Sequence, residues 1–580
     1  MGRFAGFALA LSAFFLPVIN PDIFWHFSAA RYIVEHLRVP RTDFLAWTMQ
    51  GREWVDFEWL SQLILYGLYQ LGGFRLLVVF KGTLLAATMV ISWRTAALSG
   101  RNSAAWLYMP LFAAGIITNS DLRPENFSLL FFALLLYRLE RERVCGAPRF
   151  NFRAGALTAL FFAVWTNLHA GYLYGLVLLA IYFLGGFARA ALPFIQGRSA
   201  GLLPGGRYSA YLKYAAIGLA ATLVNPYGWR IYGVILNHQK YIGLLQDYIQ
   251  EWNTFDLTNL YQAPYIITLA GVFGIFLWRF IRTREIVYEH FGALIFFAYA
   301  SSNHSRHIPF FIMTALPYSV AMLSPGAMED MRKYLLRALQ SLAMVAVILY
   351  YNALIWPRYT GDSTLFESYS EGISDFLQTN KGRLSGLRLF NYWGWGGFLG
   401  YKLYPDYKVF IDGRYLFHEN LKEAVSVGSS PELWGKFIEK YKFDLAVITL
   451  DNNKITVKRK LPGGREVIFW RPAYLFYLPK KEWAVVYWDY RAAVLVRRQA
   501  VDPVWLSGME YRYFRPADSV NIVLPVLEGE IRLSELDTEI RRYLKSNTVY
   551  HEQSSVTAEV LKYQNAIKKL CREKTAKCRS

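Results

Sequence analysis

Two carboxylates lie close to apolar segments near the start of this sequence. Residues 4–19 are almost entirely apolar, Asp22 follows directly after them, and Glu58 lies between Trp54 and Trp59. A carboxylate at the mouth of a membrane cavity can act as a general base that removes the proton of an acceptor hydroxyl. Asp22 is equally suited to cap a helix, since Asp is a favoured N-cap residue and gains from the helix dipole. Glu58 is either a second acid of the same site or an interfacial charge beside an aromatic belt.

Cationic side chains recur at the ends of later apolar segments. Arg123 follows residues 104–120, and Arg306 and His307 stand between two apolar runs. Because arginine offers bidentate donors to phosphate, we expect Arg306 and His307, together with Arg123, to bind a lipid phosphate. Snorkelling or helix capping is the alternative for these cations. Three further side chains in comparable positions are expected to line the cavity, although His169 could equally be a buried histidine with satisfied hydrogen bonds: Asn167, His169 and Tyr227.

The composition is that of a polytopic membrane protein. The 580-residue chain is 54% hydrophobic, 17% aromatic and only 18% charged, which is too apolar for an ordinary soluble protein. Many of the cations behind the net charge of +20 fall in short loops between apolar spans, where the positive-inside rule predicts them. We expect no nucleic-acid partner, because no cluster of basic residues lies within a recognisable nucleic-acid-binding motif. P-loop, GxSxG, HExxH and Rossmann fingerprints are also missing from the sequence.

Hydropathy and loop charge together predict a topology with a cytoplasmic amino terminus. The apolar segments predicted to span the membrane are eleven: 4–19, 74–93, 104–120, 126–139, 154–168, 170–187, 210–224, 264–281, 291–302, 308–323 and 338–356. In this order, every loop assigned to the cytoplasm carries arginine, which agrees with the positive-inside rule. The candidate site residues then fall in loops on the opposite side or, for Asn167, at the end of a span on that side. Ionisable residues so close to apolar spans are costly and tend to be functional.

The soluble parts of the chain are the first outer loop and the carboxyl-terminal region. The loop, residues 20–73, is predicted to hold two amphipathic interfacial helices, Asp22–Leu37 and Asp56–Leu71. Residues 1–356 thus form a transmembrane domain, and residues 357–580 form an extracytoplasmic α/β domain with a helical tail. The expected strands are Leu387–Phe390, Lys408–Ile411, Leu445–Thr449 and Val485–Val496, and the expected helices are Pro431–Tyr441 and Leu533–Leu544.

Two short motifs and two cysteines in the carboxyl-terminal domain have more than one interpretation. Asp412-Gly413-Arg414 indicates a turn capped by its aspartate. Residues 393–397, WGWGG, form either a carbohydrate-stacking platform or, as we favour, a tight strand-to-helix turn. Cys571 and Cys578 would lie about 10 Å apart along a straight helix, too far to bridge. Either the tail is non-helical there or both thiols are free.

An ordered set of motifs resembles the GT-C glycosyltransferases. NPDIFWHFSAARYIVEHLRVPRTD at 20–43 and GREWVDFEWL at 51–60 are similar to the D-x-W-W-H, I-P-x-x-D and W-x-x-x-E-W-L pattern in the first outer loop of bacterial relatives of these enzymes. Further motifs of the same group follow in the same order, and the resemblance spans about residues 1–450. These motifs are at 123–125, 165–169, 225–229, 305–307 and 409–414.

The resemblance implies a fold, a donor and a catalytic residue. The superfamily includes protein O-mannosyltransferases, the lipid A aminoarabinose transferase and oligosaccharyltransferases, which use sugars carried on polyprenyl phosphate. Their catalytic carboxylate stands in the first outer loop beside the first span, a position held here by Asp22. The mannosyltransferases pair two adjacent acids, whereas this chain has Pro21-Asp22-Ile23. A second acid would therefore be Glu58 or Asp56, and Asp43 is expected to be structural.

The sequence therefore predicts a GT-C type α-helical membrane protein of the bacterial inner membrane. It would transfer a sugar from polyprenyl phosphate to an extracytoplasmic protein, lipid or glycan with inversion, and Asp22 would be the general base. No cofactor is indicated, and a divalent metal is left open. One alternative is a transporter or flippase of lipid-linked substrates, which needs polar residues through the span interiors. Another is a non-catalytic assembly factor for envelope polysaccharide that acts through the terminal domain.

Overall fold

The computed structural model separates the chain into two compact units. It describes residues 2–99, 105–146, 150–195, 208–323, 332–360, 369–428, 430–450, 454–460, 466–516, 518, 526, 529–547 and 555–573. The first unit comprises residues 1–41 and 55–364, and the second comprises residues 42–54 and 365–580. Residues 42–54, which we call the 42–54 segment, therefore leave the first unit and return to it within the first outer loop.

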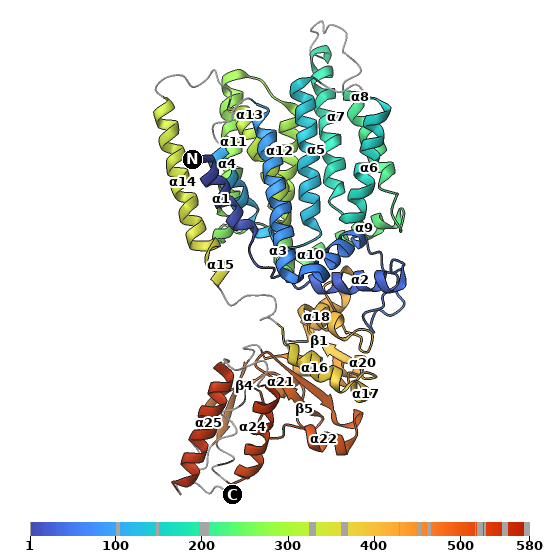
Figure 1. Cartoon of the computed structure of the whole chain (residues 1–580), viewed down its shortest axis with the longest axis vertical. Helices are drawn as coiled ribbons and strands as arrows, with labels where there is room; N and C mark the ends of the chain where they lie inside the picture. The colour runs from blue at the N-terminus through green and yellow to red at the C-terminus, as the bar shows by residue number, and fades with distance from the viewer. Residues whose placement is uncertain are drawn as a thin grey trace. The chain divides into compact units, whose positions relative to one another are not determined.

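The first unit is mostly helical, and each predicted span overlaps one described helix. These helices are α1 (Gly2–Phe14), α3 (Trp59–Ala97), α4 (Ala105–Ile116), α5 (Glu125–Cys145), α6 (Phe152–Leu168), α7 (Tyr172–Ile195), α8 (Tyr208–Ala221), α11 (Ala263–Thr283), α12 (Tyr288–Asn303), α13 (Ile308–Met322) and α14 (Arg332–Tyr350). Within the unit, α3 packs against α5, α5 against α7, and α7 against α12, as neighbouring rods (Figure 1).

Four described segments are long and apolar enough to cross a membrane: Trp59–Ala97, Tyr172–Ala191, Leu260–Thr283 and Ser341–Tyr359. Phe4–Phe14, Leu107–Asn119 and Phe152–Leu168 are shorter apolar helices. Because successive helices run in opposite directions, the start of α5 and the ends of α6 and α12 lie at one end of the bundle. The loops that carry the candidate residues are at these helix ends.

Two helices of the first outer loop occupy the predicted ranges. The first is α2 (Ile23–His36). The second is the opening part of α3, which begins at Trp59 and is interrupted by non-helical torsion angles at Gly72 and Gly73. Gly73 has φ of +60° and ψ of −157°, a conformation that only glycine adopts readily. The break therefore separates the predicted interfacial helix from the predicted span 74–93.

The second unit contains a small mixed sheet with strand order β1-β2-β6-β5. β1 (Leu389–Asn391) is parallel to β2 (Leu445–Thr449), which pairs antiparallel with β6 (Ala492–Arg497), and β6 pairs antiparallel with β5 (Trp483–Trp488). A separate hairpin joins β3 (Lys454–Lys460) to β4 (Glu466–Pro472). The predicted strand Leu445–Thr449 is confirmed. The prediction of one strand over Val485–Val496 is wrong, because the chain turns at residues 489–491 and forms the two antiparallel strands β5 and β6.

The helices that cover this sheet include α16 (Glu371–Thr379), α18 (Trp393–Leu403), α19 (His418–Val427), α20 (Pro431–Tyr441) and α22 (Pro503–Met509). The prediction of α20 is confirmed at both ends. The prediction that the WGWGG motif forms a strand-to-helix turn is wrong, because residues 393–397 are the first five residues of α18, and Tyr392 is the single residue between β1 and this helix. A Cβ at Gly396 would lie 1.8 Å from the carbonyl oxygen of Ile411, so the backbones approach too closely there for any other residue.

The prediction of a sheet strand at Lys408–Ile411 is wrong. Within the described residues, Val409 instead forms an isolated parallel bridge with Ala46 of the 42–54 segment. The N–H of Trp47 donates to the carbonyl oxygen of Val409 at 3.1 Å, and the N–H of Val409 donates to that of Leu45 at 3.1 Å. Val409 is thus paired, but with a segment more than 350 residues earlier in the chain.

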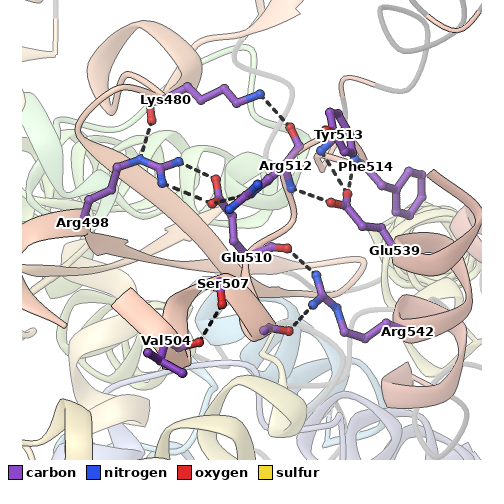
Figure 2. Close-up of polar contacts among 11 residues, drawn as sticks. Lys480, Arg498, Val504, Ser507, Glu510, Arg512, Tyr513, Phe514, Glu539 and Arg542 are labelled. Atoms are coloured by element: carbon purple, nitrogen blue, oxygen red, sulfur yellow. Dashed lines mark hydrogen bonds and ion pairs between the residues drawn. The ribbon is translucent and has the colours of Figure 1, made fainter. Parts of the chain in front are cut away.

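The predicted helix Leu533–Leu544 is confirmed as α24 (Leu533–Asn547), and a polar cluster docks it. The Glu539 carboxylate accepts three consecutive backbone N–H groups, from Arg512 at 2.8 Å, Tyr513 at 3.0 Å and Phe514 at 2.7 Å (Figure 2). Beside it, the guanidinium of Arg498 donates two hydrogen bonds to Glu510. These contacts satisfy the polar backbone of the loop and hold the helix against it.

The last helix, α25 (Ser555–Arg572), ends one residue after Cys571. Cys571 is disulfide-bonded, and the free cysteine among the described residues is Cys145. The alternative in which both thiols are free is therefore wrong for Cys571. Cys578 lies outside the described residues.

Candidate active site

Asp22 stands at the first position before α2. Its side chain makes no capping hydrogen bond to the described first turn of the helix, and its own N–H donates to Oδ1 of Asn20 at 2.8 Å. The carboxylate is partly exposed and helps to raise the pKa of Glu58. Asp22 is thus at the N-cap position, but its carboxylate does not act as the cap.

Glu58 lies between two histidine rings. Nδ1 of His26 is 3.9 Å from Oε2 of Glu58, and Nε2 of His169 is 3.6 Å from Oε1. Burial raises the pKa of Glu58 to about 8, with further increases from Asp56 and Asp22 that outweigh the opposing effect of Arg306. Glu58 therefore carries a proton at neutral pH, as expected for a carboxyl with little solvent and other acids nearby.

His169 is held in one tautomer by its neighbours. The N–H of Gly171 donates to its Nδ1 at 3.0 Å, so that nitrogen is an acceptor. Nε1 of Trp165 donates to Oγ of Ser128 at 2.8 Å, and the Ser128 hydroxyl lies 2.8 Å from the same Nδ1 and donates to it. The remaining proton is on Nε2, which faces Glu58. Burial, with Arg306 and Arg123, lowers the pKa of His169 to about 3, so the ring stays neutral.

Asn167 fixes the beginning of α3. Its Oδ1 accepts a hydrogen bond from Nε1 of Trp59 at 2.8 Å, while its Nδ2 donates to the carbonyl oxygens of Ala163 and Val224 at 2.7 Å and 2.8 Å. An open groove of about 490 Å³ adjoins this contact. Its lining is largely apolar: Trp59, Leu60, Ala163, Val164, Asn167, Leu223, Val224, Asn225 and Pro226.

Arg123 and Arg306 share one counter-ion. Arg123 forms a hydrogen-bonded ion pair with Oε2 of Glu251, and Nη1 of Arg306 lies 3.7 Å from Oε1 of the same carboxylate. The Arg306 guanidinium also lies over the Trp252 ring, 4.6 Å from its centroid. Burial opposes ionisation of Glu251, but the two arginines outweigh it and hold the pKa of Glu251 below its ordinary value. Glu251 is therefore a counter-ion shared by both guanidinium groups, and Glu125 also interacts electrostatically with both of them.

The segment around Glu251 is fastened to the loop that carries Arg306. The Ser305 N–H donates to the carbonyl oxygen of Asn253 at 2.9 Å, and Nδ1 of His304 contacts that of Trp252 at 2.8 Å. Both loops flank short 3-10 turns, η2 (Gln250–Trp252) and η4 (Ser305–His307). This pairing of loops explains why Arg306 meets Glu251.

The hydrogen bonding and the charge of His307 do not favour direct phosphate binding. Its Nδ1 lies 3.1 Å from the carbonyl oxygen of Ala300 and donates to it. Burial and the adjacent Arg306 lower its pKa to about 3, so the ring is neutral and Nε2 is an acceptor. Its ring contacts that of Tyr174 edge-on, with centroids 5.4 Å apart.

Tyr227, which was predicted to line the cavity, contacts the middle of the first outer loop. Its hydroxyl donates to the carbonyl oxygen of Pro40 at 2.7 Å, and the Arg41 guanidinium lies over its ring, 5.4 Å from the centroid. Tyr227 is 5% exposed. Tyr227 therefore contacts the two residues that immediately precede the 42–54 segment.

Two residues that the sequence analysis did not single out complete these groups. His26 lies four residues after Asp22, so it faces the same side of α2, and that spacing was a readable signal. Glu251 had no comparable signal, because it is separated from Arg123 by 128 positions. Among the described residues, no three side chains of the usual ligand types are grouped around a metal position.

The chain is a multi-pass membrane protein with the fold of the GT-C glycosyltransferases. No protein-family model and no curated protein sequence matches it. Its structure is similar to the crystal structure of the Archaeoglobus fulgidus oligosaccharyltransferase in the apo form, with a TM-score of 0.53 and 12% identity over 98% of this chain and 86% of that one.

Two further solved structures extend this comparison. The same oligosaccharyltransferase with a tethered acceptor peptide containing the NVT sequon gives a TM-score of 0.56 at 12% identity, over 99% of this chain and 86% of that one. ArnT from Cupriavidus metallidurans bound to undecaprenyl phosphate gives 0.43 at 13% identity, over 86% of this chain and 98% of that one. At these identities the likeness concerns the fold alone, and it rests on the two oligosaccharyltransferase structures, whose TM-scores exceed 0.5.

Proposed function

We propose that this chain is an inverting glycosyltransferase that moves a sugar from a polyprenyl-phosphate donor to a protein, lipid or glycan acceptor outside the cytoplasm. One observation carries the proposal. Two acids, Asp22 and Glu58, are electrostatically coupled to two guanidinium groups, Arg123 and Arg306, at the loop ends of the helical unit. A transfer from a lipid phosphate needs this combination of a base and a cationic clamp for the leaving group.

Asp22 is the general base. It takes the proton of the acceptor hydroxyl or amide as that nucleophile forms a bond to the anomeric carbon. The bond from that carbon to the phosphate oxygen breaks in the same displacement, and the electron pair leaves with the polyprenyl phosphate. Asp22 stands at the start of α2, where the helix dipole is positive.

Glu58 has a different role from Asp22, because it keeps its proton at neutral pH. Its neutral carboxyl group donates a hydrogen bond to the bound substrates, and the neutral rings of His26 and His169 orient it. Acids whose surroundings push their pKa values apart commonly divide the work in this way. This makes Glu58 a hydrogen-bond donor in the site and leaves Asp22 as its single base.

Arg306 and Arg123 bind the donor phosphate. Glu251 holds the two guanidinium groups close to each other, and their donors suit the geometry of a phosphate. His307 stabilises the Arg306 loop through its bond to Ala300 rather than contacting phosphate. The apolar groove beside Trp59 is suited to part of the polyprenyl chain.

The proposed setting is a bacterial inner membrane with eleven spans and a cytoplasmic amino terminus. Residues 1–356 would be the transmembrane domain and residues 357–580 the extracytoplasmic domain. The arginines of the inner loops support this orientation. The disulfide at Cys571 supports an oxidising compartment for the carboxyl-terminal tail.

The test is transfer by the full-length protein in lipid nanodiscs, supplied with a panel of polyprenyl-phosphate sugars and with peptide, lipid and glycan acceptors. Asp22→Asn should lower turnover by about 10²- to 10⁴-fold, the usual contribution of a general base, with donor binding unchanged. Glu35→Gln is the matched control, since Glu35 is on the same helix and pairs with Arg31 at 2.7 Å. It should keep wild-type turnover.

Wild-type turnover by Asp22→Asn would remove the assigned base. A protein that moves the lipid donor across the membrane without transferring sugar would support a flippase instead. If Asp22→Asn is silent in cells while deletion of residues 357–580 is not, the chain acts as an assembly factor.

A further inference from the structure

The 42–54 segment is closed at its base. Thr42 and Glu53 form an antiparallel bridge, and the N–H of Asp43 donates to the carbonyl oxygen of Arg52 at 2.8 Å. The chain therefore enters and leaves the segment at nearly the same place. It enters after α2, which carries Asp22 and His26, and it leaves four residues before Glu58.

The buried guanidinium of Arg414 contacts residues near both ends of the 42–54 segment. Nη1 of Arg414 lies 2.5 Å from Oδ1 of Asp43, and Arg414 donates to both oxygens of Asp412, from Nε at 2.9 Å and from Nη2 at 2.6 Å. The same guanidinium lies over the ring of Trp54, 4.5 Å from its centroid. Asp43 is near the start of the segment and Trp54 is its last residue.

These groups are almost completely removed from solvent. Arg414 and Asp43 are each 3% exposed, and Asp412 is 0% exposed. A buried ion group of this kind adds little net stability, because the cost of removing its charges from water offsets much of their attraction. Its effect is to specify one arrangement of the segment.

The two connections of the segment to the first unit are also held. On the entry side, Pro40 accepts the hydrogen bond of Tyr227. On the exit side, Trp59 donates to Asn167. The short stretch between Trp54 and Trp59, which carries Glu58, is therefore fixed at one end by Arg414 and at the other by Asn167.

We propose that Arg414 is a positioning residue for the transfer reaction: by clamping Asp43 and Trp54 it fixes the stretch that carries Glu58. This inference rests on the proposed function. Arg414 touches no candidate catalytic group, so it acts only through the chain. Lysine would not replace it, because a single ammonium cannot bind two carboxylates in this planar geometry and stack on an indole.

Arg414→Gln and Arg414→Lys in the full-length protein test this role. Both should lower kcat by at least about tenfold at a temperature where the variant is folded, while KM for the lipid donor changes less than about twofold. Arg471→Gln is the matched control, since Arg471 also forms a two-bond pair, at 3.2 Å and 2.6 Å to Asp518 in the second unit. It should leave kcat within about twofold of wild type.

A rescue experiment separates positioning from general stability. Antiparallel bridged residues have Cα separations that a disulfide can span, so the double substitution Thr42→Cys and Glu53→Cys can close the base covalently. In the Arg414→Gln background, the oxidised protein should recover most of its kcat and should lose it again on reduction. The wild type and Arg414→Gln, treated with the same reductant, show the contribution of the Cys571 disulfide.

Full kcat in Arg414→Gln, an equal loss in Arg471→Gln, or failure of the disulfide to restore turnover would overturn the proposal. Hydrogen exchange gives a reading that needs no transfer assay: amides at 55–60 should exchange faster in Arg414→Gln, while those of α5 and α7 should not change. Unchanged exchange at 55–60 would also overturn it. If the wild type transfers no sugar but exchange at 55–60 does increase, the proposed function fails while the clamp stands.

Discussion

Nε2 of His169 lies 3.6 Å from Oε1 of Glu58, and the hydrogen bonds at the opposite ring nitrogen leave the proton on Nε2. A neutral histidine thus presents a donor to a carboxyl group that is itself protonated at neutral pH. The pair is held by α6 and by the start of α3, two elements that are distant in the sequence. This relationship is the basis for separating the role of Glu58 from that of Asp22.

Substitution of Glu58 should distinguish a hydrogen-bond donor from a base. Glu58→Gln keeps a neutral donor of the same size, so we expect turnover within about tenfold of wild type at pH 7. Glu58→Ala removes the donor and should lower turnover by about 10²-fold or more, the scale of losing one site donor. Steady-state transfer assays at matched expression provide the comparison. Equal, complete loss in both variants would instead indicate that the ionised carboxylate is needed.

The pKa of Glu58 also predicts how stability depends on pH. The folded state holds the pKa at about 8, above the ordinary value of 4.5, so folding favours the protonated form. This contribution is fully present below about pH 4.5 and is lost as the pH rises through 8. The melting temperature of the wild type should therefore fall more than that of Glu58→Gln between pH 5 and pH 9. Parallel pH profiles for the two proteins would contradict the raised pKa.

The shared counter-ion predicts opposite effects on donor binding for two nearby substitutions. Arg306→Ala removes a charge-assisted contact worth about 1.5–3 kcal/mol, so KM for the lipid donor should rise by at least about tenfold while KM for the acceptor stays within about twofold. Glu251→Gln releases both arginines and should tighten binding of polyprenyl phosphate. The measurement is a titration with that lipid alone, which avoids any dependence on the acceptor. Weaker binding in Glu251→Gln would show that Glu251 positions the arginines more than it competes with phosphate.

A second buried ionic group predicts a loss of stability without a loss of chemistry. Glu140 on α5 accepts from Arg143 at 2.9 Å and 2.8 Å, and Nε2 of His290 on α12 lies 3.1 Å from both of its oxygens. Glu140→Ala should destabilise the first unit by about 3–5 kcal/mol, because it leaves the buried imidazole of His290 and the partly buried guanidinium of Arg143 without their partner. Thermal unfolding in nanodiscs measures this change. Turnover per folded molecule should stay near wild type, since Glu140 lies about four helical turns from the start of α5.

Hydropathy predicted the helices well because it reports a local property. A run of apolar residues long enough to span a bilayer must form a helix there, since its backbone groups find no other hydrogen-bond partners. The ranges of α20 and β2 were equally readable, as a capped amphipathic helix and a short apolar strand. The strand predicted at 408–411 was wrong because a local pattern cannot identify the partner of a segment. Val409 pairs with Ala46 rather than with a strand of the sheet.

The candidate site divides along the same line. By itself, the sequence determined where the acids and cations stand relative to the apolar segments, and the order of motifs indicated a GT-C fold and Asp22 as the candidate general base. Only the tertiary structure decided that Glu58 lies between His26 and His169, that Glu251 joins Arg123 to Arg306, and that the 42–54 segment belongs to the second unit. These are contacts between residues far apart in the chain. Their energies depend on burial and on geometry of a few tenths of an ångström, which no local pattern of residues records.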